Sequence, residues 1–512
     1  MQAWLIKLDE VAPQKLFWWI VSFSIGLAAW IQYIQHGWIN PDSVLYFEQA
    51  RLISLGDWRG AVAVFNWPFY GICIALVHKF TTLSIHTSAQ ILNVVFFGAA
   101  TASYLRLIQL IGGTSCAMIC GALILFGSQY IVGDVLGMLL RDEGFWTFFL
   151  ASMVFLIQYL QQHKIRDAVI WQVSIIIATL FRIEAICYLL GLPIAFFFLS
   201  KEPWQNRLRH IVYTYSVSLF IIAVIFMTLL LNPDLSMKNF GRLQEVFSLN
   251  LYNEFTANLK EKAKVMADQV LGKFLNEFAI PGLLITFIYA ILIKIISSAG
   301  IIPCALNLYG MQRRLHNALE KNAYFVLRAT ALIAIISMAL IITKVFVLSG
   351  RYVVAFSWIL MIFAALYYAE LLQSTNKKHL FSAIFIAILL SLGLVKNIWP
   401  KREGYNYMQD AAAWLQQKNI NNNSVFYDDS RMRYASGAPF VGTWGDNRNY
   451  FLQTIPKNIH INKYNYLVIS SNKKHPETIN YIQKYLLQYK CVATFYNPQK
   501  TKGIFIYQLQ NK

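Results

Sequence analysis

The stretch IIIATLFRIEAICYLL at residues 175–190 places an arginine and a glutamate inside an otherwise apolar run. The whole run extends over residues 167–200, whereas a membrane-spanning helix needs only about 20 mainly apolar residues. A charge at the centre of a bilayer costs at least about 2.5 kcal/mol. Arg182 and Glu184 are therefore expected where two short helices meet, rather than in the middle of one long helix.

The flanks of this run favour the same interpretation. HKIR at 163–166 precedes it and KEPWQNRLRH at 201–210 follows it, and both segments are basic. Short loops rich in Lys and Arg lie on the cytoplasmic side of membrane proteins, so both flanks are predicted there. Two crossings that meet near Arg182 on the external side satisfy this condition, and a single crossing does not.

Most of the chain has the same apolar character. Of its 512 residues, 57% are hydrophobic and only 13% are charged, whereas a soluble protein has about 25% charged residues. This composition predicts a polytopic α-helical membrane protein with about 11 transmembrane helices. Besides the two helices within 167–200, the predicted spans are 16–36, 87–110, 114–133, 144–162, 210–231, 278–298, 323–346, 352–372 and 379–399.

The distribution of Lys and Arg in the loops predicts the orientation. With the N-terminus in the cytoplasm, the basic segment QRRLHNALEK at 312–321 is also cytoplasmic, as the positive-inside rule requires. The transmembrane domain then covers residues 1–399. Its two long external loops are 37–86 and 232–277. In the first of them, the short apolar run 68–80 is expected to lie at the membrane interface.

An odd number of spans leaves residues 400–512 outside the membrane as a soluble domain. Segments 407–420 and 476–490 have the periodicity of amphipathic helices. The predicted strands are 424–429, 464–470, 491–497 and 503–509. These elements predict a small α/β domain with a partly parallel sheet. The domain contains none of the motifs GxGxxG, GxxxxGK[ST], HExxH or GxSxG.

The net charge and the cysteines exclude two other classes of protein. A formal charge of +19 suggests nucleic-acid binding, but no basic helix or aromatic-basic strand module is visible. Cytoplasmic loops and a basic soluble domain account for the excess, so no nucleic-acid partner is expected. The six cysteines are scattered, without CxxC spacing or a disulfide framework.

The predicted topology places the ionisable residues near the span ends on the external side. Some have ordinary explanations: Asp42 and Glu48 as solvated loop residues, and Arg351 as an interfacial anchor. Asp142 can cap a helix, and Arg182 with Glu184 can form a structural pair. Their common side is the stronger signal, because charges that converge at one leaflet indicate a polar cavity. The full set is Asp42, Glu48, Asp134, Arg141, Asp142, Glu143, Arg182, Glu184, Lys344 and Arg351.

Several short motifs follow one another along the chain. They are PDSVLYFEQARLISLGDW (41–58), NWPFYGICIAL (66–76), LRDEGFW (140–146), ATLFRIEA (178–185) and GRYVVAFSWILMIFAAL (350–366). In this order they resemble the GT-C superfamily of membrane glycosyltransferases, in the branch of the protein O-mannosyltransferases and the lipid A aminoarabinose transferase. The segment 411–437 also resembles the external domain of such bacterial enzymes. The chain departs from the family pattern at Phe69, where a proline is usual, and at Ser43, where many members have a second acid after the aspartate.

The resemblance implies transfer of a sugar from a polyprenyl-phosphate donor on the external face, with inversion at the sugar. Asp42 is expected to be the catalytic base, since an acid at a protein–lipid boundary is partly desolvated. Glu143 and Asp142 are expected to orient the acceptor or to hold a divalent cation, and the metal requirement is left open. Arginine holds phosphate in a bidentate fork. The candidates for the donor phosphate are Arg351, Arg182, Arg141 and Lys344, and those for support of the acceptor or the structure are Glu48, Glu184, Tyr352 and Trp67.

The implied setting is a bacterial inner membrane, with residues 400–512 in the periplasm. The acceptor is then a lipid, a glycan or a protein of the cell envelope, with lipopolysaccharide among the candidates. The alternatives are a transporter or flippase, and an O-antigen ligase or polymerase. A transporter is expected to show interrupted helices in both halves, but only one charged interruption is visible, at 182–184. A transporter also has no obvious use for the soluble domain.

Overall fold

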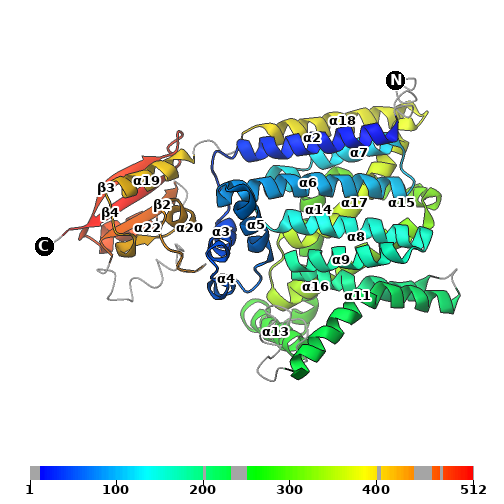
Figure 1. The fold of residues 1–512 in the computed structure, drawn as a ribbon, viewed down its shortest axis with the longest axis horizontal. Helices are drawn as coiled ribbons and strands as arrows, with labels where there is room; N and C mark the ends of the chain where they lie inside the picture. The colour runs from blue at the N-terminus through cyan, green and yellow to red at the C-terminus, as the bar shows by residue number, and fades with distance from the viewer. Residues whose placement is uncertain are drawn as a thin grey trace. The chain divides into compact units, whose positions relative to one another are not determined.

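A computed structural model shows the fold of residues 12–199, 203–231, 251–400, 405–442, 464–472 and 477–510. Within these ranges, eight helices are long and apolar enough to cross a membrane, or nine if a bent pair is counted as one span. The protein is mainly helical, with one small sheet near the C-terminus (Figure 1). The predicted fold class, a polytopic helical membrane protein with a small α/β domain, is confirmed.

The crossing helices begin and end close to the predicted apolar runs, because the length of an apolar run is a local property of the sequence. They are α2 (Pro13–Tyr33), α6 (Ile85–Leu110), α8 (Asp142–Gln162), α11 (Trp204–Leu231), α14 (Ala279–Ala299), α16 (Lys321–Val345), α17 (Gly350–Gln373) and α18 (Lys377–Ile398). The bent pair consists of α7 (Ser115–Phe126) and η1 (Gln129–Val135).

The apolar run 167–200 is divided at Arg182, as predicted. It forms α9 (Ile165–Phe181), η2 (Ile183–Ala185), α10 (Ile186–Ala195) and η3 (Phe196–Phe198). Of the predicted external loop 232–277, residues 232–250 lie outside the described residues. The remainder contains α13 (Leu251–Met266), η5 (Ala267–Leu271) and η6 (Asn276–Phe278).

Two breaks in the helical region were not predicted. The chain bends by 46° between α7 and η1. A Cβ on Gly127 at this bend would come within 2.7 Å of the Leu390 carbonyl oxygen, so the glycine allows α18 to pass closely. A second break, at Gly300, separates α14 from the short helix α15 (Ile301–Gln312), and η7 (Leu315–Ala318) follows. Neither of these breaks contains a charged residue, unlike the predicted interruption at 182–184, and a break without a charge leaves little trace in an apolar sequence.

The chain divides into two compact units, each described here by itself. The first comprises Met1–Ala28, Asn93–Leu136 and Arg141–Ile398. The second comprises Ala29–Leu92, Gly137–Leu140 and Trp399–Lys512. The second unit therefore combines the whole of segment 37–86, predicted as an external loop, with the C-terminal region, predicted as a soluble domain.

The first unit has an aromatic core around α17. Trp358 is fully buried between two neighbours, with ring centroids 5.4 Å from Tyr104 of α6 and 6.0 Å from Trp146 of α8. α8 and α9 run side by side along much of their length (Figure 1). This packing fixes the start of α8 and the end of α9, where charged residues meet.

The second unit contains short helices from its N-terminal segment and the sheet. The helices are α3 (Pro41–Ser54), α4 (Trp58–Val64) and α5 (Phe69–Thr81), the last of which matches the predicted interfacial run. The strands are β1 (Val425–Tyr427), β2 (Tyr466–Asn472), β3 (Tyr489–Tyr496) and β4 (Lys502–Leu509). Their order is β1-β2-β4-β3, with β1 parallel to β2 and the other pairs antiparallel. The sheet is thus partly parallel, as predicted.

Helices cover both faces of this sheet, and they are α19 (Asn406–Gln417), η8 (Asn422–Ser424), α20 (Ser430–Ala435) and α22 (Glu477–Tyr485). Alternate side chains of a strand point to opposite faces. Val468 of β2 accordingly packs in one core with α19, whereas Leu467 and Ile469 pack in the other with Ile482 of α22. The result is a small three-layer α/β domain.

Candidate functional site

Arg182 occupies the break between α9 and η2. The residue has extended backbone angles, φ −141° and ψ 119°. Its N–H still donates to the Ala178 carbonyl at 2.8 Å, and its carbonyl accepts from the Ala185 N–H at 3.0 Å. The helix is therefore interrupted without leaving these two backbone groups unpaired in a low-dielectric region.

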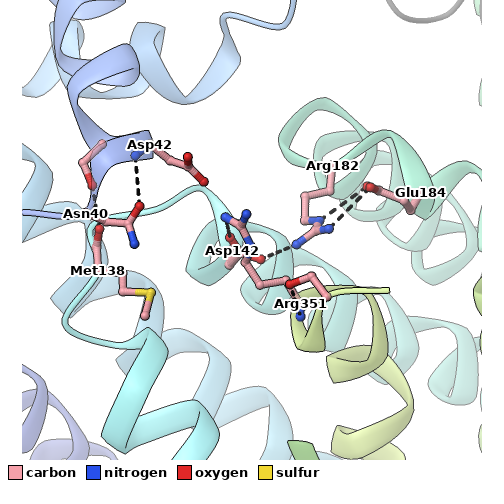
Figure 2. Close-up of polar contacts among 9 residues, drawn as sticks. Asn40, Asp42, Met138, Asp142, Arg182, Glu184 and Arg351 are labelled. Atoms are coloured by element: carbon pink, nitrogen blue, oxygen red, sulfur yellow. Dashed lines mark hydrogen bonds and ion pairs between the residues drawn. The ribbon is translucent and has the colours of Figure 1, made fainter. Parts of the chain in front are cut away.

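The Arg182 guanidinium bridges two carboxylates (Figure 2). Nη1 donates to Oδ1 of Asp142, the first residue of α8, while Nε and Nη2 each lie 3.4 Å from a Glu184 oxygen. The side chains of Arg182 and Asp142 are only 5% and 1% exposed. Because burying charges is costly, these bonds are what makes the arrangement tolerable.

Arg351 reaches the same carboxylate from a third helix. Its Nη1 lies 3.7 Å from Oδ2 of Asp142, and its side chain is 31% exposed. It belongs to the first turn of α17, where the Ser349 hydroxyl accepts from the Arg351 N–H at 3.4 Å. We call Asp142, Arg182, Glu184 and Arg351 the charged cluster. It joins the N-termini of α8 and α17, whose helix dipoles add partial positive charge there.

Aromatic rings surround the charged cluster. The guanidinium carbon of Arg182 lies 4.9 Å from the ring centroid of Tyr352 and 5.9 Å from that of Phe145. A Cβ on Gly350 would come within 2.6 Å of the Tyr130 ring, so this tyrosine of η1 packs directly on the start of α17. Phe145 and Tyr130 were missed at the sequence level, because aromatic residues make up 15% of the chain and none of them stands out.

Glu143 is buried beside Asp142 without a comparable partner. The residue is 0% exposed, and neither carboxylate oxygen has a hydrogen-bond partner among the residues that the structure describes. The Thr147 hydroxyl donates to the Glu143 backbone carbonyl at 2.9 Å, not to its side chain. A buried acid without a donor is costly, and such a group in a native protein is a candidate for a functional role.

The two other predicted cations, Arg141 and Lys344, lie at helix ends. Arg141 occupies the N-cap position of α8, so Asp142 is the first helical residue rather than the cap considered above. Arg141 is close enough to Glu184 to interact with it electrostatically. Lys344 lies in the last turn of α16 and is partly buried. Within the described ranges, no ion pair joins Lys344 to the charged cluster.

Asp42 belongs to the second compact unit. It lies exposed in the first turn of α3, where its N–H donates to the Asn40 side chain at 2.9 Å (Figure 2). The next residue is buried, and the Ser43 hydroxyl donates to the Met138 carbonyl at 2.7 Å, which fixes the start of α3. The pairing of Asp42 with Arg351 in one pocket stays a prediction.

Glu48 and Trp67 are the other predicted residues of this unit. Glu48 accepts from Arg51 on the same face of α3, at 2.7 Å, and this hydrogen bond raises the pKa of Arg51 above its ordinary value. Trp67 is 7% exposed and precedes α5.

Among the residues that the structure describes, no group of three or more His, Cys, Asp or Glu is arranged to hold a metal ion, and the metal requirement stays open.

The arrangement in the first unit is suited to binding an anion. Buried Asp142 forms an ion pair with Arg351, and the Arg351 side chain remains partly exposed. The guanidinium is in the first turn of a helix, where anions are favoured. An arginine fixed in this way presents its remaining N–H groups in a set direction, which suits a phosphate or carboxylate.

Comparison with known proteins shows the fold. No protein-family model matches the sequence, and no curated protein matches it. The chain is similar to the crystal structure of an oligosaccharyltransferase from Archaeoglobus fulgidus, tethered to an acceptor peptide, with a TM-score of 0.55 and 12% identity over 97% of this chain and 74% of that one. It is also similar to the arabinofuranosyltransferase AftD from Mycobacteria, with a TM-score of 0.47 and 12% identity over 96% of this chain and 40% of that one. The first likeness confirms the predicted GT-C-like fold.

Proposed function

We propose that this protein is a membrane glycosyltransferase that moves a sugar from a polyprenyl-phosphate donor to an acceptor on the external face of a bacterial inner membrane. The observation that carries the proposal is Arg351, a partly exposed arginine anchored by a buried aspartate at the start of α17. The similarity in fold to a membrane oligosaccharyltransferase is consistent with it. The sequence motifs quoted above supply the donor class.

In this proposal Arg351 contacts the donor phosphate. A departing lipid phosphate gains negative charge as the bond to the sugar breaks, and preorganised cationic donors stabilise that charge. Arg182 is too buried and too fully paired to take this role, so it holds Asp142, and through it Arg351, in position. Arg141 and Lys344 remain secondary candidates for the phosphate.

Asp42 is the proposed catalytic base. Both oxygens of Asp142 face arginines, and the residue is fully buried, which makes it a poor candidate for contact with an acceptor. Asp42 is exposed on α3. The acceptor hydroxyl attacks the anomeric carbon, the bond from that carbon to the phosphate oxygen breaks, and the phosphate leaves with the bonding electrons. Asp42 takes the hydroxyl proton, and the configuration at the sugar inverts.

The proposal is tested by mass spectrometry of cell-envelope glycans and lipid A from cells with and without the protein. The expected result is a sugar modification that is present only with the wild-type protein and is lost with Asp42→Asn and with Arg351→Ala. Arg106→Ala is the matched control, because Arg106 is an exposed arginine in the last turns of α6 that donates a local hydrogen bond to Gln109 at 3.1 Å. An unchanged glycan and lipid profile would refute the proposal, and a lost transmembrane solute flux would favour the transporter alternative.

A further inference from the structure

The second compact unit contains a cavity that none of the predicted site residues lines. Its volume is about 320 Å³, within the usual range for small-molecule sites. Its walls are formed by segment 37–39, by His86 at the start of α6, and by helices α19 and α20. The cavity thus lies between the first predicted external loop and the soluble domain, within a single unit.

Aromatic side chains form much of the cavity wall. Trp38 and Tyr405 have ring centroids 5.9 Å apart. Tyr434 also lines the cavity, and its ring centroid lies 5.4 Å from that of Phe47. Trp38 comes from the loop and both tyrosines from the C-terminal region. Flat rings with a polar edge suit a ligand that has an apolar face and hydroxyl groups at its rim, which is the surface of a pyranose ring.

Neutral polar groups accompany these rings. Gln409 and Gln416 line the cavity from α19, and each amide offers both donors and an acceptor, as neighbouring sugar hydroxyls require. His86 Nε2 is buried without a hydrogen-bond partner among the described residues. Gly37 has φ +76°, and a Cβ there would come within 2.4 Å of the Gln409 amide nitrogen. The glycine therefore lets this amide lie directly against the loop.

The charge in the cavity is compensated internally. Arg431 pairs with Asp429 through Nε at 3.0 Å and through Nη2 at 2.5 Å. Burial opposes the charge on Arg431, but the hydrogen bonds to Asp429 keep its pKa above the ordinary value. Among the described residues, no other Asp, Glu, Lys or Arg lines this first cavity, so a neutral ligand is favoured there over an ionic one.

A second cavity of about 170 Å³ adjoins the first, since both are lined by Tyr405, Met408 and Arg431. It lies beside Ser470 and Ser471, two to three residues beyond the part of β2 that pairs in parallel with β1. Lys502 also lines it, with Nζ 6.0 Å from the ring centroid of Tyr405, and an ammonium group can donate hydrogen bonds to sugar hydroxyls. Ligands of α/β domains commonly bind at this end of parallel strands. The two cavities together offer room for a ligand longer than one ring.

We propose that the two adjoining cavities bind a neutral oligosaccharide, with one ring against Trp38 and Tyr405 and the next ring toward Ser470. Binding of the saccharide stands on the cavities alone. Only its role as the acceptor glycan rests on the proposed glycosyltransferase function.

The test is saturation-transfer difference NMR on the full-length protein in detergent micelles. The probes are methyl α-mannoside, methyl β-glucoside and N-acetylglucosamine, together with their disaccharides. At least one sugar is expected to bind, and its disaccharide more tightly. Trp38→Ala and Gln409→Ala are each expected to weaken binding about tenfold. The controls Trp58→Ala and Gln417→Ala change exposed residues of the same unit that do not line either cavity, and they are expected to leave binding unchanged.

The outcomes separate this inference from the proposed function. Saccharide binding that is sensitive to Trp38 and Gln409, without any sugar transfer in cells, would support the site and refute the glycosyltransferase. Failure of every probe to bind at high millimolar concentration would overturn the site, whatever the transfer assay shows. Equal weakening by Trp38→Ala and Trp58→Ala would also overturn it. A thermal unfolding scan of each variant identifies those that do not fold. Gln409 is an exposed residue, so Gln409→Ala should fold and keeps the test decisive if Trp38→Ala is unfolded.

Discussion

Two of the arginine–carboxylate pairs in this protein lie in opposite surroundings. On α3, Arg51 and Glu48 pair at 2.7 Å with side chains 50% and 15% exposed. In the first unit, Arg182 pairs with Asp142 and Glu184 while its own side chain is only 5% exposed. The first pair is local, three residues apart on one helix, whereas Asp142 and Arg182 are joined across two segments of the chain.

The difference shows which pair can position a functional group. An exposed pair contributes little, about 0.2–1 kcal/mol, because water and salt compete with it. A buried pair is not strongly stabilising as a whole, but removing one partner leaves an uncompensated charge and costs about 3–5 kcal/mol. The buried arrangement is therefore rigid. Arg351 is ion-paired with Asp142 of this arrangement, so its guanidinium is also held in position while it remains partly exposed.

The largest expected effect follows from removing the buried guanidinium. Arg182→Met keeps a similar length of apolar side chain but leaves Asp142 without its main partner, so the free energy of unfolding should fall by about 3–5 kcal/mol. Denaturant or thermal unfolding in detergent micelles measures this loss. The double variant Arg182→Met with Asp142→Asn is expected to recover part of it, since the uncompensated charge is gone. A single variant as stable as the wild type would show that the pair is not buried in the membrane protein.

The second effect concerns activity rather than stability. Arg351→Ala removes the exposed cation at the edge of the charged cluster, but Asp142 keeps its bond to Arg182. We expect sugar transfer to fall about 10- to 100-fold, the equivalent of one lost hydrogen bond to a charged group of about 1.5–3 kcal/mol. The measurement is the transfer rate at saturating donor, with Arg106→Ala as the control. Arg351→Lys should recover only part of the rate, because lysine lacks the bidentate fork. Full activity of Arg351→Ala would remove this residue from the phosphate site.

The fold was predictable where the signal is local. Apolar length fixed the expected span 144–162, and the helix observed is Asp142–Gln162. The charged pair in the run 167–200 predicted the break, and α9 indeed ends at Phe181. The alternation of strand residues likewise predicted the four strands of the soluble domain, although their order β1-β2-β4-β3 depends on contacts that no single segment encodes.

The site was predictable only in part. Positive-inside reasoning placed Asp142, Arg182 and Arg351 on one side of the membrane, and the structure joins them by ion pairs. Positive-inside reasoning did not reveal that the Arg182 side chain is buried between two carboxylates whereas the Arg351 side chain is partly exposed. This difference in exposure depends on how α8, α9 and α17 pack. The saccharide cavity left no sequence signal at all. Its wall combines Trp38 with residues of α19, which are far apart in the chain.

A smaller effect of opposite sign is expected at Glu143. This acid is buried without a hydrogen-bond donor among the described residues, and burial disfavours its charged form. Glu143→Gln keeps the shape of the side chain but cannot ionise, so it should raise the free energy of unfolding by up to about 1 kcal/mol. If the acid orients the acceptor, the same variant should lose sugar transfer. The matched control is Glu277→Gln, an exposed acid of η6, which should change neither quantity. A destabilised Glu143→Gln variant would show that the carboxylate has a structural partner.

The smallest effect is expected at the exposed pair of Arg51 and Glu48. Its coupling energy is the reference with which the coupling of the buried pair is compared. Glu48→Ala and Arg51→Ala should each change the free energy of unfolding by less than about 1 kcal/mol, and the coupling between them should be about 0.2–1 kcal/mol. This coupling should shrink further at 1 M salt, where the Debye length is about 3 Å. The coupling between Arg182 and Asp142 should barely respond to the same salt, because buried charges are poorly screened. Double-mutant cycles at low and high salt measure both pairs in one set of unfolding experiments. Equal salt responses would mean that water reaches Arg182, and the charged cluster would then lose the rigidity on which the role of Arg351 depends.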